Sequence, residues 1–417
     1  MLASLQDILD TVKSNTLTYQ QKLMCLGNIA ERLFDPRELL GYTDEEWQFL
    51  QNQMICDLNE GYAIYRPRYI LPDYNVYIKK GCEFLELPAP KNLDEALDGL
   101  LILYSHVPSI TTFPVYIGRL DMLLDPFITD EEQDYIKIKR FLNHVDKTVP
   151  DSFCHANIGP YDTKAGRLIL KAVIELEAPT PNMTIRYDKS KTSREFAELA
   201  AKACLLVSKP SFANDAYYIS DLGEQYGIAS CYNALPECGG AYTLTRLRLG
   251  TIARACKTVD EMVNKLLPRV AKCALSTMDK RHKFVVEESN FFNTSFLEKE
   301  GFIKRTNFTG MFAIVGLADA ANHLLQQEGL NETFGKSQRG DEIATLIMDK
   351  LKEVTDNHEG VYAERTGNRY LLHAQVGASN HEEDKRNAPA HRIRVGEEPT
   401  LLAHLKQSAP FHKYFPS

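Results

Sequence analysis

Short apolar runs alternate with amphipathic helical patterns from about residue 150 onward, and this alternation restricts the fold more than any other feature of the sequence. The run "NMTIRYD" has strand character and precedes "TSREFAELAAKACLLV", whose apolar residues recur with the helical period. The apolar run "MFAIVG" likewise precedes a helical pattern, "LADAANHLLQQEG", which we expect to end at Gly329. Strands that alternate with helices in this way predict an α/β protein with a mostly parallel sheet, open or closed.

The rest of the chain extends this organisation. Further strand candidates are "PSFAND", "GIASCYN", "YTLTRLRL" and "YLLHAQVG". The helix after "NMTIRYD" has a start signal, because Thr192 can cap its first turn and Glu195 follows three residues later. The N-terminal segment, by contrast, is composed mostly of helical patterns. We therefore expect one large domain, with a helical N-terminal layer at 1–58 and an α/β core at 59–417.

Composition and charge exclude several classes of function. The 417-residue chain carries 48 Lys and Arg against 56 Asp and Glu, and the resulting net charge of −8 argues against a nucleic-acid or membrane-surface binder. The sequence contains no apolar run of about 18 residues, and its N-terminus lacks the basic start and cleavage site of a signal peptide. Nine cysteines without any C-x-x-C spacing favour free thiols in a reducing cytoplasm over disulfides or a zinc site.

The stretch "GIASCYNALPECGG" places Cys231 at the tip of a turn between two strand-like runs. Pro236 fixes one backbone angle, and Gly239 and Gly240 permit positive φ, so we expect a stiff reversal with a fixed tip. Packing is the commoner role of a free cysteine, but a packing cysteine would more naturally lie in mid-strand among Val and Leu. An ionic nucleophile would need a histidine or a helix N-terminus nearby, and the local sequence offers neither. A thiol without an ionising partner suits hydrogen-atom transfer better.

Four uncommon segments make the sequence similar to a known family. The segments "MICDLNEGYAIYRPRYILPDY", "CHANIGP", "GIASCYNALPECGG" and "MFAIVGLADAAN" occur in the order expected for the YjjI-type branch of the glycyl radical enzymes. The resemblance runs from about Cys56 to Pro416. It implies a cytoplasmic, anaerobic enzyme built on a ten-stranded α/β barrel of two half-barrels. A cysteine loop would project into the centre of that barrel.

The resemblance also implies a radical chemistry. In the family, a radical S-adenosylmethionine activase installs a glycyl radical, which takes a hydrogen atom from the loop cysteine. The resulting thiyl radical then takes a hydrogen atom from a carbon of a small-molecule substrate. Carried onto this sequence, the thiyl position is Cys231.

The radical-bearing glycine is a departure from the family. That glycine lies near the family's C-terminus in an Arg-Val-x-Gly-aromatic pattern, whereas in "RIRVGEEP" Gly396 directly follows Val395 and precedes Glu397. We therefore expect either a small glycyl-radical-bearing subunit that acts in trans, or a truncated form of the enzyme. The chain would then bind no cofactor of its own and would be inactive alone, and a homodimer is left open.

The substrate is a second point of departure. Dehydratases of the superfamily carry Cys-x-Glu, but here the third residue is Asn233, which cannot exchange a proton at neutral pH. Formate-lyase members carry two consecutive cysteines, and here Ser230 and Tyr232 flank Cys231. The four-cysteine zinc site of the anaerobic ribonucleotide reductases is also missing. The substrate and the reaction therefore stay unassigned.

Several polar residues are candidates for substrate binding. Asn233, His155 and Asn157 are candidates for the polar lining of the site, although a core role for His155 is an alternative. Adjacent strand residues point to opposite faces, so Cys154 is not automatically paired with His155. The last three candidates are Arg66, Arg68 and His373. The two arginines could hold an anionic substrate or could brace a loop through backbone carbonyls, and His373 could point into the barrel or belong to the core.

Two other functions remain open on the sequence. The chain could be a non-catalytic barrel that binds a partner or a small metabolite. It could also be a metal-dependent enzyme that uses Cys154, His155 and carboxylates. A short neighbouring gene with an Arg-Val-x-Gly-Tyr motif beside an activase gene would favour the radical enzyme, and stoichiometric zinc or iron would favour the metalloenzyme.

Overall fold

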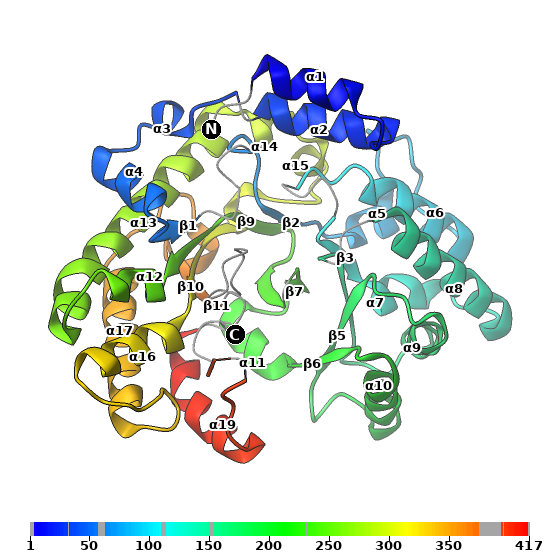
Figure 1. Ribbon diagram of the computed structural model, residues 1–417. Coiled ribbons are helices and arrows are strands. Elements are labelled where there is room, and N and C mark those ends of the chain that lie inside the picture. The colour runs from blue at the N-terminus through cyan, green and yellow to red at the C-terminus, as the bar shows by residue number, and fades with distance from the viewer. Residues whose placement is uncertain are drawn as a thin grey trace.

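Two sheets face each other across a central β-hairpin in the computed structural model of the chain (Figure 1). The structure describes residues 4–31, 33–56, 63–109, 114–149, 153–230, 232–374, 393–394 and 396–415. The strands are β1 (Ile55–Cys56), β2 (Tyr69–Leu71), β3 (Tyr116–Arg119), β4 (His155–Ile158), β5 (Asn182–Tyr187), β6 (Ser211–Asn214), β7 (Tyr226–Ala229), β8 (Asn233–Pro236), β9 (Gly239–Arg248), β10 (Phe308–Val315) and β11 (Leu371–Ala374).

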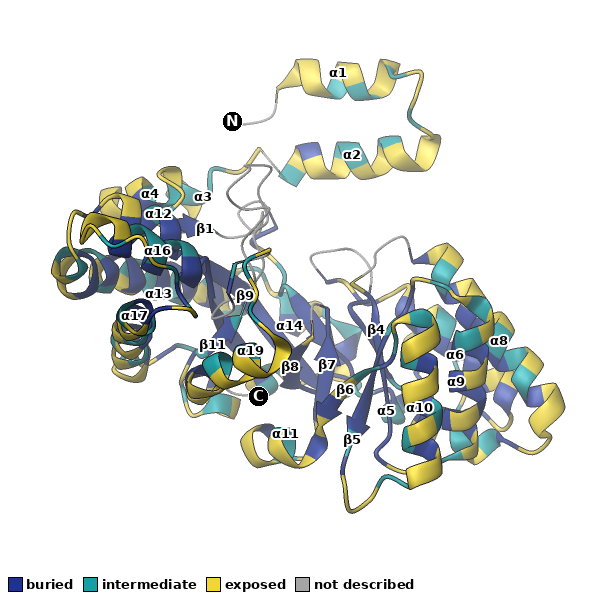
Figure 2. Ribbon diagram, turned by 60° about the horizontal axis from the view of Figure 1, so that its bottom comes forward, coloured by how far each residue is buried: buried dark blue, intermediate teal, exposed yellow. Residues whose placement is uncertain are grey.

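Helices form the outer layer of the molecule. In the N-terminal half these are α1 (Leu5–Lys13), α2 (Tyr19–Glu31), α3 (Pro36–Leu39), α4 (Asp44–Gln51), α5 (Asn75–Lys80), α6 (Leu93–Tyr104), α7 (Leu120–Leu124), α8 (Glu131–Thr148), α9 (Lys164–Leu176) and α10 (Arg194–Val207). The later helices are α11 (Asp215–Leu222), α12 (Leu249–Arg254), α13 (Leu267–Lys283), α14 (Phe291–Thr294), α15 (Phe296–Lys299), α16 (Leu317–Gln327), α17 (Gln338–Asp356) and α19 (Leu401–Ser408). Figure 2 shows buried strands inside and exposed helix faces outside.

The first half-barrel is the parallel sheet β3-β4-β5-β6. All of β4 and most of β3 and β5 are buried because both of their faces are covered, whereas the edge strand β6 is largely exposed. Helices α8, α9 and α10 lie along its outer side (Figure 1). In α9, the apolar residues at the helical period put Ile169 and Val173 into the core and leave the polar side chains in solvent.

The second half-barrel has the order β1-β9-β10-β11, and β2 also pairs with β9. β9, β10 and β11 are parallel to one another, whereas β1 and β2 run antiparallel to β9. Phe312 and Ile314 of β10 point outward into a cluster with α12, α13, α16 and α17. Met311 and Ala313 belong to the other core cluster, so the alternation of the strand separates an outer face from an inner face.

These observations confirm the α/β fold with two half-barrels that the sequence predicts. Two local expectations were wrong. The cap of α10 is Ser193, whose Oγ accepts the Phe196 N–H, while the Thr192 hydroxyl instead accepts the Asp188 N–H. The glycine pair does not form the turn: a Cβ on Gly239 would lie 2.3 Å from the Asn307 carbonyl oxygen, and one on Gly240 2.0 Å from that of Tyr69. These glycines let β9 pack tightly between its neighbours.

A buried ion pair attaches the base of the hairpin to the first half-barrel. Arg186 of β5 donates from Nε to Oδ1 of Asp215 at 2.7 Å, and its guanidinium lies 3.9 Å from the ring centroid of Tyr226. The Tyr226 hydroxyl donates to the same carboxylate oxygen at 2.7 Å. Both charged side chains are at most 2% exposed. The two opposite charges compensate each other in this buried environment.

We expect Asp215→Ala to lower the free energy of unfolding by about 3–5 kcal/mol, because it leaves the Arg186 charge buried without its carboxylate. Urea unfolding followed by circular dichroism measures this change. The matched control is Glu198→Ala, which breaks the exposed Arg194–Glu198 pair on α10 and should leave stability unchanged. Equal effects of the two substitutions would contradict the role given to the buried pair.

Candidate active site

The hairpin β7–β8 lies between the two half-barrels, and Ser230 and Tyr232 lie at the end where Ala229 pairs with Asn233 (Figure 1). Ala229 pairs with Asn233, so the loop consists of residues 230–232. Cys231 lies outside the described residues, but both of its neighbours are described. Ser230 has φ +55° and Tyr232 has φ +68°. Left-handed conformations are costly for residues with a side chain and persist where the surroundings enforce them, often at functional sites.

His155 holds the residue before Cys231. Its Nδ1 lies 3.0 Å from the carbonyl oxygen of Ser230, and because a carbonyl can only accept, Nδ1 carries the proton. Nε2 then accepts from the Thr184 hydroxyl at 2.8 Å, and Ser211 Oγ lies 2.9 Å beyond it. The chain of bonds crosses β4, β5 and β6 and ends at the loop. The Tyr232 ring packs edge-on against the imidazole at 5.1 Å between centroids.

Burial keeps His155 neutral. The side chain is fully buried, and this loss of solvent lowers its pKa from 6.5 to about 4, although the Ser230 carbonyl acts in the opposite direction. At neutral pH the imidazole is therefore a fixed hydrogen-bond donor. It positions the loop and adds no charge to it.

Asn157 holds the strand that leads into the loop. Its amide nitrogen donates to the Ile228 carbonyl at 2.9 Å, and its amide oxygen accepts the Ile228 N–H at 2.8 Å. The Asn157 side chain thus provides hydrogen-bond partners for both the N–H and the C=O of Ile228. These two groups face β4, which does not pair with β7 as a strand. Asn157, which the sequence suggested as polar lining, is placed as a brace of the hairpin.

The second half-barrel contacts the same loop. Ser230 Oγ donates to the Tyr69 hydroxyl at 3.2 Å, so one residue is tied to β4 through its carbonyl and to β2 through its side chain. The backbone N–H of Arg68 donates to the Tyr242 carbonyl, and its guanidinium lies 5.1 Å from the Tyr69 ring. Arg66 reaches outward instead and pairs with Glu31 of α2 at 3.1 Å.

Of the other predicted residues, Asn233 and His373 are buried. Asn233 begins β8, directly after the loop, and is 5% exposed. His373 lies in β11, and its pKa is lowered to about 4 by burial. Cys154 belongs to the apolar core cluster, whereas the His155 side chain bonds to the hairpin and to β5, which agrees with the expectation that these neighbours point to opposite faces.

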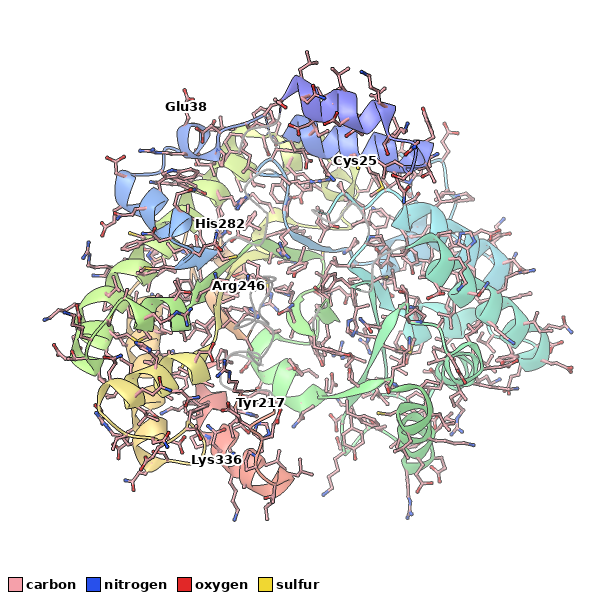
Figure 3. All side chains as sticks on the ribbon, in the orientation of Figure 1. Cys25, Glu38, Tyr217, Arg246, His282 and Lys336 are labelled. Atoms are coloured by element: carbon pink, nitrogen blue, oxygen red, sulfur yellow. The ribbon has the colours of Figure 1, made fainter. Side chains whose placement is uncertain are left out.

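Glu237 and Arg246 are buried ionisable residues that the sequence did not single out. Glu237 lies at the base of the hairpin, accepts from the Tyr116 hydroxyl at 3.1 Å, and has a pKa raised to about 7 by burial. Arg246 is 3% exposed and lies toward the middle of the molecule in Figure 3. The available signal was the "TRLR" pattern in β9, where charged residues alternate with an apolar one inside a strand that has no exposed face.

No group of three or more His, Cys, Asp or Glu side chains within the described ranges converges to hold a metal ion. In the same part of the chain, no helix is long and apolar enough to cross a membrane.

Comparison with known proteins identifies the family. A sequence profile described as glycyl radical enzyme, YjjI-like, matches residues 17–417. The chain belongs to this family. It is 93% identical over 417 residues to a protein of Haemophilus influenzae, covering all of this chain and 81% of the relative. It is 42% identical over 407 residues to the Escherichia coli protein YjjI, covering 97% of this chain and 77% of the relative.

Solved structures support the fold of this family member. The anaerobic ribonucleotide reductase of Thermotoga maritima, with MES in its active site, matches with a TM-score of 0.73 at 10% identity, over 99% of this chain and 80% of that chain. The hydroxyproline dehydratase of Clostridioides difficile matches with a TM-score of 0.65 at 12% identity, over 89% of this chain and 70% of that chain. At these identities the likeness concerns the fold alone.

We expect Asn157→Ala to lower the free energy of unfolding by about 2–4 kcal/mol, because it leaves the buried N–H and C=O of Ile228 without partners. Chemical denaturation measures the change. Asn293→Ala on the exposed α14 is the matched control, since its amide bonds only to the exposed Asn290 side chain. A loss no larger than that of the control would contradict the bracing role.

The His155 pKa gives a prediction of pH dependence. The native imidazole should stay neutral from about pH 8 to about pH 5, whereas an unfolded histidine takes up a proton below about pH 6.5. The contribution of His155 to stability is therefore present above pH 6.5 and is lost as the pH falls toward 4. NMR of ¹³C-labelled histidine, with His155→Gln for assignment, measures the titration. A midpoint near 6.5 would disprove the burial argument.

Proposed function

We propose that this chain is the thiyl-bearing barrel component of a YjjI-type glycyl radical enzyme, and that Cys231 performs radical C–H activation on a small-molecule substrate. The observation that carries the proposal is the double attachment of Ser230, the residue before Cys231. One half-barrel binds its carbonyl through His155, and the other binds its hydroxyl through Tyr69. A loop held from both sides can keep a sulfur at a constant distance from a substrate carbon, and hydrogen-atom transfer requires such positioning.

The proposed reaction needs no proton acceptor at the sulfur. The glycyl radical takes the hydrogen atom of the Cys231 thiol, so that an S–H bond breaks and a glycine C–H bond forms, leaving the unpaired electron on sulfur. The thiyl radical then takes a hydrogen atom from the substrate, which reforms the S–H bond and moves the electron to a substrate carbon. The groups that hold Ser230 are neutral: the imidazole of His155, whose pKa lies at about 4, and the Tyr69 hydroxyl.

In this proposal the radical comes from a glycine outside these 417 residues. We propose that a small glycyl-radical-bearing subunit supplies it in trans, since these residues contain no Arg-Val-x-Gly-aromatic pattern. In a longer form of the chain, the glycine would instead belong to the same polypeptide. A radical S-adenosylmethionine activase would install the radical on that subunit. Both radicals react with oxygen, so we place the enzyme in the cytoplasm of cells that grow without oxygen. The chain alone would then be inactive.

The reaction type is narrowed by the residue that follows the loop. Asn233 occupies the position where the dehydratases carry a glutamate, and an amide can donate to or accept from a substrate oxygen but cannot take its proton. The buried Glu237 lies at the opposite end of the hairpin from the loop, because β8 pairs Pro236 with Tyr226 at its base. We therefore propose a reaction that does not depend on a carboxylate base beside the thiyl radical.

We expect Cys231→Ser to fold normally and to lose all turnover when it is assayed with the glycine-bearing partner and the activase, because an O–H bond is too strong for the glycyl radical to break. Substrate consumption from anaerobic cell extract, followed by mass spectrometry, measures activity. The matched control is Cys238→Ser, seven residues later in the same stretch, which should remain active. Full activity of Cys231→Ser would refute the proposed function and would favour a binding role for the barrel.

A further inference from the structure

One row of residues crosses the inner face of the second half-barrel. The strand register aligns Cys56 of β1 with Arg246 of β9, Arg246 with Ala313 of β10, and Ala313 with His373 of β11. Paired residues on neighbouring strands point to the same side of a sheet. A guanidinium and an imidazole therefore lie on the same face, two strand spacings or about 10 Å apart at their backbones. In this row, Ala313 is the residue between them.

The packing of the neighbouring residues shows which side of the sheet this row faces. Leu247, Ile314 and Leu372, each next to a member of the row, belong to the cluster with the outer helices. On β11, Leu371 packs instead against the cluster that contains Ile228 and Ala234 of the hairpin. Alternation along the strand then directs His373, two residues after Leu371, to the same inner side.

The row lies near the end of the hairpin that carries the loop. Leu371 of β11 and Leu244 of β9 both pair with Met311 of β10, so they lie at the same height in the sheet. Leu371 also packs against the apolar cluster that contains Ile228 and Ala234 of the hairpin. β9 follows β8 after a short turn, so chain positions further along β9 lie further from the hairpin base and closer to the loop. Arg246 and His373 are the next inward-facing residues after Leu244 on β9 and Leu371 on β11. The row therefore lies on the side of the sheet that faces the hairpin, beyond the Leu371 position.

His373 has an unusual environment for a buried polar side chain. It is 7% exposed, and its Nε2 has no hydrogen-bond partner among the described residues. The two other buried histidines in the described ranges both have hydrogen-bond partners: His155 as above, and His282 with the Thr243 and Tyr370 hydroxyls at 3.0 and 2.9 Å. A buried ring nitrogen without a partner costs free energy unless a ligand supplies one. His373 thus marks a place for a ligand.

We propose that Arg246 and His373 form a subsite for the carboxylate or phosphate group of the substrate, which would make that substrate a small organic anion. This proposal rests on the proposed function, because it assigns the subsite to the molecule whose C–H bond Cys231 attacks. A guanidinium offers paired N–H donors that match the oxygens of either group. The bond from Arg246 Nη2 to Cys56 Sγ at 3.1 Å fixes where the guanidinium lies.

Charge on the inner face favours an anion over a neutral ligand. Arg248 follows Arg246 by two residues and points to the same side, level with Val315, while its Nη1 lies 3.3 Å from Oε1 of Gln53. A neutral His373 adds one N–H donor for a further anion oxygen. The original candidates Arg66 and Arg68 are not needed in this arrangement.

Binding can be measured on the purified chain without any radical, which separates this proposal from the proposed function. The probes are inorganic phosphate and lactate, with glycerol as an uncharged control. NMR of ¹³C-labelled histidine should show phosphate, lactate or both moving the His373 signal, while the His282 signal stays in place. A response to phosphate alone assigns a phosphate group, and a response to lactate alone assigns a carboxylate.

Variants test the two residues directly by calorimetric titration with the anion that responds. Arg246→Gln and His373→Asn should each weaken its binding at least about tenfold, because each removes a hydrogen bond to a charged group. Arg194→Gln on α10, whose side chain is 87% exposed, is the matched control and should bind as the wild type does. Cys231→Ser should also bind normally, so loss of turnover in that variant tests only the proposed function.

Three results would overturn the subsite. The first is a wild-type His373 signal that neither anion moves at millimolar concentration, and this measurement does not depend on whether the variants fold. The second is unchanged anion affinity in both Arg246→Gln and His373→Asn. The third is a response to glycerol as large as the response to the anions.

Discussion

The hydrogen bond from His155 to the Ser230 carbonyl is the interaction on which the arrangement of the site depends. It joins a strand of one half-barrel to the residue before Cys231, and the Ser230 hydroxyl joins the same residue to Tyr69 of the other half-barrel. The hairpin has few strand contacts of its own, because β7 and β8 pair only with each other in the described sheets. Side chains of the surrounding strands therefore determine where the loop lies.

The nature of these attachments agrees with one-electron chemistry. Burial holds the His155 imidazole neutral, and Asn157 is an amide, so the bonds that hold β7 and its loop bring no formal charge to Ser230. Ionic groups lie further away: the Arg186–Asp215 pair and Glu237 sit at the base of the hairpin. This distribution anchors the hairpin at its base through ionic groups and holds Ser230 through neutral ones.

The sequence predicted the elements better than it predicted their contacts. Alternation of apolar runs located β5, β10 and the helices that follow them, because local periodicity reports burial directly. The cap of α10 shifted by one residue because Ser193 and Thr192 are both suitable cap residues, and the bond of Thr192 to the Asp188 N–H four residues earlier separates them. The bonds of Asn157 and His155 connect residues 71 and 75 positions apart, which no local pattern reveals. Arg246 was missed for a similar reason, since its position relative to His373 follows from strand register.

The central claim is that a glycine outside these residues exchanges a hydrogen atom with Cys231, and electron paramagnetic resonance in D₂O tests it without knowledge of the substrate. A thiol exchanges its hydrogen with solvent, so a reversible transfer would place deuterium on the glycine carbon. The account predicts that the glycyl doublet of the activated mixture narrows to a singlet in D₂O with the wild-type chain and remains a doublet with Cys231→Ser. A doublet that persists with the wild-type chain, or a singlet that forms equally with the variant, would contradict it.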